Sequence, residues 1–324
     1  MRQIILGTDE AGYGPNLGPL VVSLTAWEAP SGDLSCLFEP LKNEGIHIGD
    51  SKKLYHGGSL VALETGVLVP LQHLVSTASK GMEYSMFVSC LSQRHKVHKG
   101  VELPDTPWCP SCLCAKEKHR LERNVLEEQI DSLTKKFAAV LQQHQIQLLD
   151  MQYRSVEPEE FNQLIDRFHS KGTLLSHITL RLITDQLAKL VRDGNDLPVL
   201  ILCDKHGGRN HYLDILTEFF PGEFIQTIQQ SRERSVYRLT SEGQLLEFQF
   251  LAKGESQFPI ALASMLSKYQ RELAMERFNA FWQSHVPDLQ PTAGYPEDAK
   301  RFKEQIADAQ EKLAIPDAKL WRKR

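Results

Sequence analysis

Runs of apolar residues along the chain predict strands at its beginning and helices in its later parts. The strand candidates are rich in Val, Ile, Leu, Phe and Thr and lie at residues 3–8, 20–27, 67–76, 198–203, 235–240 and 245–252. The first two runs predict an antiparallel hairpin at the start of a sheet, and the last two flank a turn typical of a second hairpin. The run at 198–203 is almost purely apolar, which is typical of a central strand covered on both faces.

Other segments carry apolar residues at helical spacing, with charged residues between them. These predict helices at 116–143, 159–168, 173–191, 211–220, 259–286 and 297–313. Strands followed by helices, then one apolar strand and more helices, predict an α/β domain with a mixed central sheet flanked by helices. We expect residues 1–80 and 146–285 to build this domain, 81–145 to be an insertion, and 286–324 to be a helical extension.

The composition and net charge limit the kinds of partner that the chain can bind. Its 324 residues are 41% hydrophobic and 24% charged, with a formal net charge of -4, as in ordinary globular proteins. A nucleic-acid-binding protein with this charge would need a local basic patch. No apolar run approaches the roughly 20 residues of a membrane span, and Met1-Arg2-Gln3 leads directly into a strand candidate without a signal-peptide pattern. We therefore expect a cytoplasmic protein with no membrane contact.

Acidic residues follow two of the predicted strands. Asp9 and Glu10 end the first strand, and Asp204 ends the apolar strand. Open α/β sheets place their ligands at the carboxyl ends of strands. Carboxylates held together there remain ionised at low cost only with a cation between them, and hard oxygen ligands favour Mg²⁺ or Mn²⁺. The other interpretation is a surface acidic pair and an Asp that caps the next helix.

Five motifs, in order, resemble those of the ribonuclease HII family. They are Asp9-Glu10-Ala11-Gly12-Tyr13-Gly14-Pro15, Asp50-Ser51-Lys52-Lys53-Leu54, the strand ending at Asp204, the segment from Lys253-Gly254-Glu255-Ser256 through Lys268 to Arg271-Glu272, and Gly294-Tyr295-Pro296. The resemblance covers about two-thirds of the chain and leaves the middle uncovered. It implies a ribonuclease H-like fold.

The activity implied by the resemblance is hydrolysis of the RNA strand of RNA–DNA hybrids with two Mg²⁺ or Mn²⁺ ions. The implied metal-binding and catalytic carboxylates are those of Asp9, Glu10, Asp204 and Glu272. Lys268 lies four residues before Glu272, so both share one helix face, where Lys268 can contact phosphate or steady Glu272. The substrate-binding candidates, for a hybrid or an RNA–DNA junction, are Gly12, Tyr13, Gly14, Lys52, Lys53, His206, Arg209, Lys268 and Tyr295.

Three departures from the family pattern leave alternatives open. Tyr13 stands where the family has Arg, Glu272 where it has Asp, and Lys205-His206-Gly207-Gly208-Arg209 replaces the usual turn. That basic turn is either a phosphate-binding element, with His206 in proton transfer, or an exposed loop. The alternative functions are a non-catalytic nucleic-acid-binding relative and a nuclease of the same fold with a DNA substrate.

The middle of the chain contains a cysteine cluster. Cys109, Cys112 and Cys114, with His95 and His98 upstream, predict a structural Zn²⁺ site, and a loop with free thiols is the alternative. Cys36, Cys90 and Cys203 lie in apolar surroundings and are expected to be buried thiols.

Overall fold

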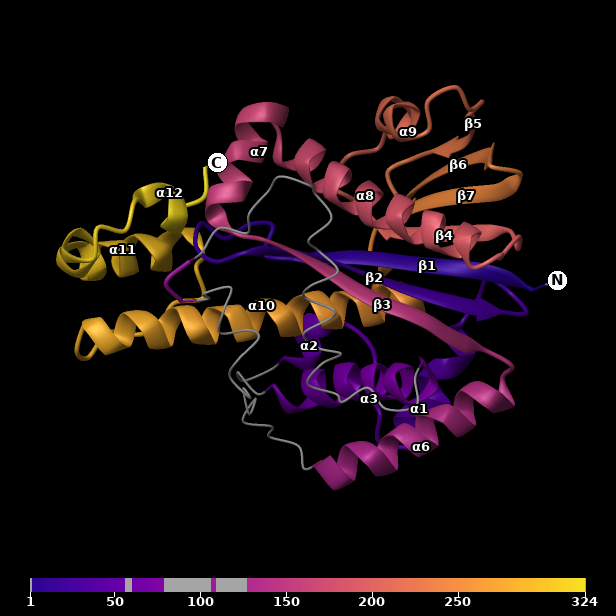
Figure 1. The fold of residues 1–324 in the computed structure, drawn as a ribbon, viewed down its shortest axis with the longest axis horizontal. Coiled ribbons are helices and arrows are strands. Elements are labelled where there is room, and N and C mark those ends of the chain that lie inside the picture. The colour runs from indigo at the N-terminus through magenta and orange to yellow at the C-terminus, as the bar shows by residue number, and fades with distance from the viewer. Residues whose placement is uncertain (1, 56–59, 79–105, 109–126, 324) are drawn as a thin grey trace.

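A mixed seven-stranded sheet forms the centre of the computed structural model, which describes residues 2–55, 60–78, 106–108 and 127–323 (Figure 1). Its strands are β1 (Gln3–Ala11), β2 (Leu20–Ala29), β3 (Gln147–Val156), β4 (Val199–Asp204), β5 (Gln226–Gln230), β6 (Arg234–Ser241) and β7 (Gln244–Leu251). Their order is β3-β2-β1-β4-β7-β6-β5. β4 runs parallel to β1 and β7, and all other neighbours are antiparallel.

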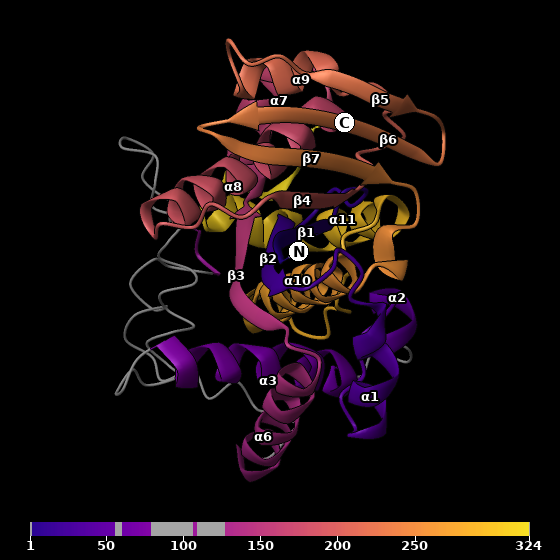
Figure 2. The same ribbon diagram turned by 90° about the vertical axis from the view of Figure 1, so that its right-hand side faces the viewer.

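Helices cover both faces of this sheet (Figures 1 and 2). On one face lie η1 (Ser35–Leu37), α1 (Phe38–Asn43), α2 (Ser51–Leu54), α3 (Val61–Ala78), α6 (Glu127–Gln143) and the start of α10 (Phe258–His285). On the other lie α7 (Pro158–Phe168), α8 (Lys171–Arg192) and α9 (Leu213–Phe219). The short helix η3 (Gly254–Ser256) joins β7 to α10, and α11 (Pro296–Lys312) and α12 (Asp317–Leu320) follow. The predicted α/β fold with a mixed, helix-flanked sheet is confirmed.

Helix α10 is fastened to the sheet through a close approach of its first turn to β1. A Cβ atom added to Gly7 would lie 2.3 Å from the carbonyl carbon of Pro259, so only glycine fits at this point of β1. The Thr25 hydroxyl on β2 donates to the Pro259 carbonyl at 2.9 Å. Phe258 packs edge-on against Trp27 from the same side. These contacts fix where the later turns of α10 lie relative to the end of β1.

Several features differ from the sequence prediction. Residues 67–76, expected to form a strand, lie within α3, because this segment is buried nearly all round and an apolar run has no period that separates strand from helix. Strand β3 was not predicted, since its polar and apolar residues do not alternate regularly. Cys36 is exposed rather than buried, because it lies in the short surface helix η1, while Cys203 is buried as expected.

Several predictions concern the middle of the chain. Of the predicted helix at 116–143, the part from Glu127 is present as α6, which packs in the same core as α3. The zinc candidates Cys109, Cys112, Cys114, His95 and His98 lie outside the described residues, as does Cys90. The four-part division of the chain stays a prediction. Within the described ranges, no helix is both long and apolar enough to cross a membrane.

Candidate active site

Three acidic residues meet where β1 and β4 end side by side. Thr8 of β1 is paired with Cys203 of β4, so the next residues of these parallel strands, Asp9 and Asp204, emerge at the same edge of the sheet. Glu10 follows Asp9 on β1, and its backbone amide donates to the Asp9 carboxylate at 2.7 Å. The predicted grouping of carboxylates at the strand ends is therefore what the parallel register produces.

Burial and mutual repulsion perturb the titration of this acidic group. Burial, and then the charge of Asp204, raise the pKa of Asp9 from 3.8 to about 7, although a hydrogen bond from Ser264 partly opposes this shift. Burial also raises the pKa of Glu10 well above its usual range, with Asp9 and Asp204 as the next causes. The pKa of Asp204 is raised mainly by burial. Three carboxyl groups thus share a region of low polarity, where a cation would lower the cost of their ionisation.

A fourth acid, Glu255, joins this group. The η3 segment lies directly against Asp204, because the Gly254 amide donates to the Asp204 carboxylate at 2.7 Å. A Cβ atom on Gly254 would be 3.0 Å from that same carboxylate oxygen. The charge of the next residue, Glu255, contributes to the raised pKa values of both Asp9 and Asp204. Sequence reasoning missed Glu255, although the signal was available in the Lys253-Gly254-Glu255 segment.

On α10, Glu272 lies among basic and aromatic side chains. Its carboxylate accepts hydrogen bonds from Lys268 at 2.6 Å and from Arg271 at 3.5 Å. Tyr55 also hydrogen-bonds to it, and the Lys268 ammonium lies 4.4 Å from the centre of the Tyr55 ring. Ser264, which contacts Asp9, is eight residues earlier on α10, about 12 Å along the helix axis. The predicted pairing of Lys268 with Glu272 is present, and both residues are held in a basic and aromatic cluster.

The Asp50–Leu54 motif places the Lys52 side chain in front of the acidic group. Asp50 is the N-cap of α2, where its carboxylate accepts from the Lys52 amide at 3.0 Å. The Ser51 hydroxyl lies 3.0 Å from that of Ser264, which ties α2 to α10. The charge of Lys52 lowers the pKa of Glu10 and of Asp204, so this ammonium faces the acidic group. Lys53 is exposed and pairs with Asp50 at 3.6 Å.

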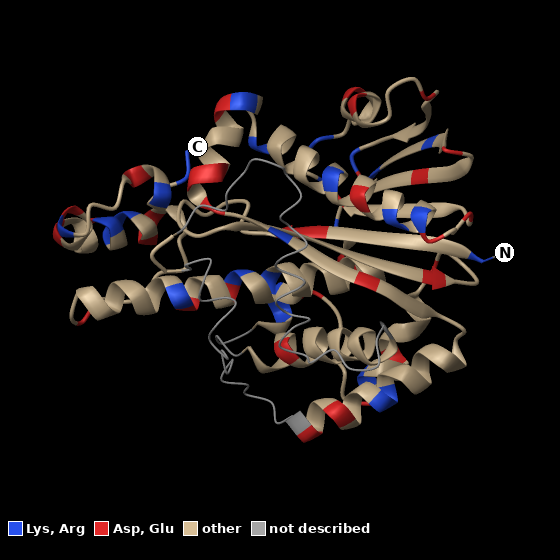
Figure 3. Ribbon diagram, in the orientation of Figure 1, with Lys and Arg blue, Asp and Glu red and all other residues tan. Residues whose placement is uncertain are grey.

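Figure 3 shows basic residues on α2 and on the middle of α10 beside the acidic end of β1. Although the net charge of the chain is -4, basic and acidic side chains therefore lie next to each other at this edge of the sheet. A phosphate backbone needs a local basic surface of this kind, and acidic ligands need a cation between them and the phosphate.

The Gly12-Tyr13-Gly14 turn follows β1 directly. Gly12 has φ +88°, and its α-carbon packs against the Arg271 side chain, so this turn needs glycine. Tyr13 extends toward the loop after β4, where a Cβ atom on Gly207 would be 2.4 Å from the tyrosine hydroxyl. Gly14 is exposed, with open space beside its α-carbon. Of the three, Gly14 therefore offers the most accessible backbone.

The turn after Asp204 differs from the predicted basic phosphate loop. His206 is 2% exposed, its Nδ1 lies 2.9 Å from the Ser176 hydroxyl, and burial lowers its pKa to about 3. A neutral imidazole in this core position does not fit the predicted role in substrate contact or proton transfer. Lys205 is also buried, and its ammonium donates to the Ser231 carbonyl at 2.7 Å. Of the basic side chains in this turn, only that of Arg209 is accessible in part, and it donates to the Thr173 hydroxyl at 2.8 Å.

Tyr295 is held beside the Gly12–Gly18 loop, because the preceding residue, Gly294, is hydrogen-bonded to that loop. The Gly294 carbonyl accepts from the Asn16 amide at 2.8 Å and from the Leu17 amide at 3.3 Å. The Arg271 guanidinium donates to the Ala293 carbonyl at 2.8 Å. Tyr295 itself is 53% exposed. The two loops are thus joined through their backbones, with the tyrosine side chain available for stacking.

Within the described part of the chain, no three His, Cys, Asp or Glu side chains stand in a ready-made metal-ligand arrangement. The chemistry of the donor set nevertheless fits a hard divalent cation, because all four acids present oxygen atoms and the pKa values of Asp9, Glu10 and Asp204 are raised by burial and by neighbouring acids. Asp9 and Glu10 are even hydrogen-bonded to each other through their carboxyl groups. Side-chain rotations would have to bring these oxygens around an ion.

Searches against protein-family models and against curated proteins gave no match. Similar solved structures include RNase HII from Archaeoglobus fulgidus in complex with PCNA, which is 13% identical over 99% of this chain and 94% of that one, with a TM-score of 0.42. Ribonuclease H2 from Pyrococcus horikoshii is 16% identical over 98% and 92% of the chains, with a TM-score of 0.41. Bst-RNase HIII in complex with Mn²⁺ is 14% identical over 99% and 66%, with a TM-score of 0.42.

Proposed function

We propose that this chain is a divalent-metal-dependent nuclease of the ribonuclease H type that hydrolyses the RNA strand of RNA–DNA hybrids. One observation carries the proposal: carboxyl groups from β1, β4 and η3 crowd one edge of the sheet, where burial and neighbouring acids raise the pKa values of Asp9, Glu10 and Asp204. Such an arrangement costs stability in a metal-free protein, so its value lies in what the acids bind. The order of the sequence motifs supports the choice of hybrid as substrate.

In this proposal, Asp9, Glu10, Asp204 and Glu255 hold the metal ions. This revises the sequence-based set, in which Glu272 was the fourth ligand, because Glu255 is the acid whose charge reaches Asp9 and Asp204. Bound Mg²⁺ or Mn²⁺ ions supply an activated water and stabilise the charge that develops on phosphate. Glu272 instead orients Lys268, at 2.6 Å, for contact with the phosphate backbone.

The remaining groups bind the substrate and orient it. Lys52 faces the acidic group and is exposed, so it is placed to contact the phosphate next to the bond that breaks. The backbone of Gly14 and the ring of Tyr295 lie on the two joined loops and are placed to meet the sugar and base of the substrate strand. Tyr13 packs toward Gly207 and leaves the approach to Gly14 open.

A cleavage assay with paired variants tests this proposal. The purified protein is incubated with Mg²⁺ or Mn²⁺ and a labelled RNA–DNA hybrid, a DNA duplex with one ribonucleotide, or plain duplex DNA. We expect metal-dependent cutting at ribonucleotides that Asp9→Asn abolishes. Glu255→Gln should reduce kcat by about 10²-fold or more, as expected for loss of a metal ligand, whereas Glu272→Gln should mainly raise KM by loosening Lys268.

The other outcomes identify the alternatives. Tight hybrid binding without any cutting would replace the nuclease by a non-catalytic nucleic-acid-binding protein. Cutting of plain DNA would change the substrate class. An unaffected Glu255→Gln variant beside an inactive Glu272→Gln variant would return Glu272 to the metal-binding set.

A further inference from the structure

A segment distant in sequence completes the loop that follows β1. We call Trp321, Arg322 and Lys323 the 321–323 segment. The Arg322 amide donates to the Asn16 carbonyl at 2.8 Å, and Leu17 forms an antiparallel β-bridge with Trp321. The Arg322 guanidinium also donates to the Pro15 carbonyl. The Gly12–Gly18 loop is therefore hydrogen-bonded on one side to Gly294 and on the other to this segment.

The 321–323 segment is itself anchored to α7. Asn162 donates from its side-chain amide to the Trp321 carbonyl at 2.8 Å and accepts from the Lys323 amide at 2.7 Å. The Arg322 guanidinium lies 4.8 Å from the centre of the Phe161 ring. These contacts connect α7, through the 321–323 segment, to Pro15 and Asn16, which belong to a loop at the candidate active site.

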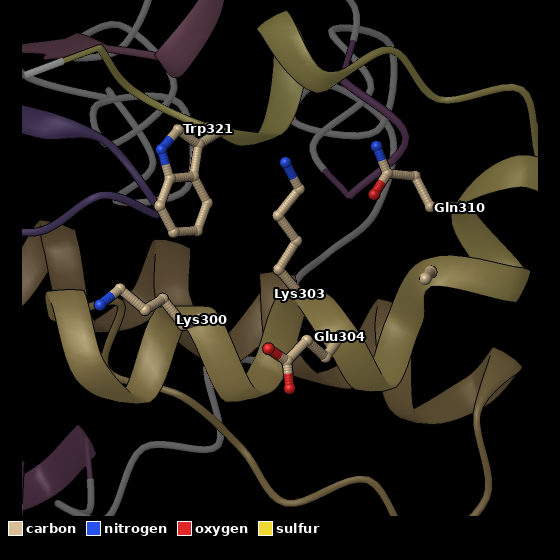
Figure 4. Close-up of a pocket in the computed structure, with 6 residues that line it drawn as sticks. Lys300, Lys303, Glu304, Gln310 and Trp321 are labelled. Atoms are coloured by element: carbon tan, nitrogen blue, oxygen red, sulfur yellow. The ribbon is translucent and has the colours of Figure 1, made fainter.

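Trp321 and Arg322 are held in different ways. Figure 4 shows Trp321 above α11, close to Lys303, whose ammonium lies 5.2 Å from the ring centre. A groove of about 400 Å³ remains open beside it, lined by Lys300, Lys303, Glu304, Ala307, Gln310 and Trp321. Arg322, in contrast, is 0% exposed. The Arg322 guanidinium is thus fully buried and anchors the 321–323 segment, whereas the Trp321 indole is only partly buried.

Arg322 is a costly residue in this position. Burial, and then the charge of Arg271, lower its pKa to about 9, opposed by Glu157. Its Nε and Nη1 atoms have no hydrogen-bond partner among the described residues. Taking a guanidinium out of water carries a large desolvation cost, which an incomplete set of partners offsets only in part. Stability alone therefore does not account for an arginine at this position. What the side chain adds is the hydrogen bond from its guanidinium to the Pro15 carbonyl.

We propose that Arg322 is a positioning residue for the substrate-reading surface: its bond to the Pro15 carbonyl holds the Gly12–Gly18 loop, and with it Gly14 and Tyr13, against Gly294-Tyr295. The inference rests on the proposed function for what this surface reads, namely the nucleic-acid strand beside the acidic group. Arg322 touches neither the metal-binding acids nor the substrate in this scheme. It acts through the backbone of the loop.

The test compares Arg322→Met with Arg322→Lys and with Lys323→Met as the matched control. Lys323 is next in the chain but exposed, and its ammonium pairs with Asp166 at 2.6 Å on the surface. Arg322→Met removes the donor and keeps most of the volume; relief of a buried, incompletely paired charge opposes the loss of the bond to Pro15, so we expect its melting temperature to change little. On a hybrid substrate, KM should rise about 10–100-fold while kcat at saturation changes less than about threefold, because loop position affects substrate capture. Arg322→Lys should recover part of the loss.

Hydrogen exchange gives a readout that does not depend on activity. The Asn16 and Leu17 amides are bonded to Gly294, and we expect peptides that cover 12–18 and 292–296 to exchange about tenfold faster in Arg322→Met. Peptides from β4 and the start of α10 should be unchanged, as should all peptides of Lys323→Met.

The outcomes separate this inference from the proposed function. Unchanged exchange in 12–18 for Arg322→Met overturns the positioning role, whatever the nuclease assay shows. A lower melting temperature with kcat and KM altered only through loss of folded protein also overturns it. Faster loop exchange in Arg322→Met, together with a wild-type protein that cuts no substrate, would leave the positioning role supported and remove the nuclease.

Discussion

Neutralising Asp9 should stabilise the metal-free protein while it abolishes cleavage. Burial and Asp204 raise the Asp9 pKa from 3.8 to about 7, a difference of about 3 units. At about 1.4 kcal/mol per unit, this is an upper limit of about 4 kcal/mol for the cost of ionising Asp9 in the folded protein. Because Asp9 is partly exposed and its neighbours adjust their own protonation, we expect Asp9→Asn to recover about 1–2 kcal/mol at pH 8.

Asparagine keeps the local geometry of this position. Its side-chain oxygen can still accept from the Glu10 amide, which the Asp9 carboxylate does at 2.7 Å, and from the Ser264 hydroxyl. The change therefore removes charge without removing a hydrogen-bond acceptor. At about 2–4 °C per kcal/mol for a chain of this size class, the melting temperature in EDTA should rise by about 2–8 °C.

The pH dependence of this effect has a definite sign. The folded-state pKa of Asp9 lies above its unfolded value, so ionised Asp9 destabilises the fold at pH values above about 7. As the pH falls from about 7 toward 3.8, the folded protein binds a proton before the unfolded chain does, and the penalty disappears. The advantage of Asp9→Asn should therefore shrink over this range.

The assay is thermal unfolding followed by circular dichroism at pH 8, 7, 6 and 5, in EDTA and in Mg²⁺. Mg²⁺ should stabilise the wild type more than the variant, since the ion binds the folded state. Asp308→Asn on the exposed face of α11 is the control and should change stability by less than about 0.5 kcal/mol. A variant that is no more stable than the wild type in EDTA at pH 8 would refute the electrostatic account of this site.

Three further changes test separate parts of the structure. Gly7→Ala should cost about 1–3 kcal/mol in urea unfolding, because the added Cβ would lie 2.3 Å from the Pro259 carbonyl carbon; equal stability would mean that α10 shifts freely. Asp50→Ala should cost about 1 kcal/mol through loss of the α2 N-cap and should also weaken hybrid binding by displacing Lys52, measured by fluorescence anisotropy. His206→Gln should lose less stability than the wild type between pH 6.5 and pH 4. The His206 pKa of about 3 in the folded protein lies below its usual 6.5, so the unfolded chain binds a proton first and acid favours unfolding. Parallel stability–pH profiles for the variant and the wild type would exclude this.

Local pattern was sufficient for most elements that position the site. The apolar run before Asp204 is strand β4, and the helical spacing after Pro259 is α10. It failed at 67–76, where a segment buried on nearly all sides carries no readable period and forms part of α3. For the site, the pattern alone placed Asp9 and Asp204 at the ends of strands, whereas the pairing of those strands and the approach of Glu255 came from the tertiary structure.

The sequence by itself determined which residue types stand at the end of each strand and which side chains share a helix face, because these depend on spacing of a few residues. It thereby paired Lys268 with Glu272, which lie 2.6 Å apart. Only the tertiary structure decided which distant segments meet: the parallel order β1-β4-β7 brings Glu255 to Asp9, and the 321–323 segment reaches Pro15 and Asn16. It also decided that His206 points into an apolar core. These outcomes depend on strand order and on which faces become buried, and no local spacing encodes either.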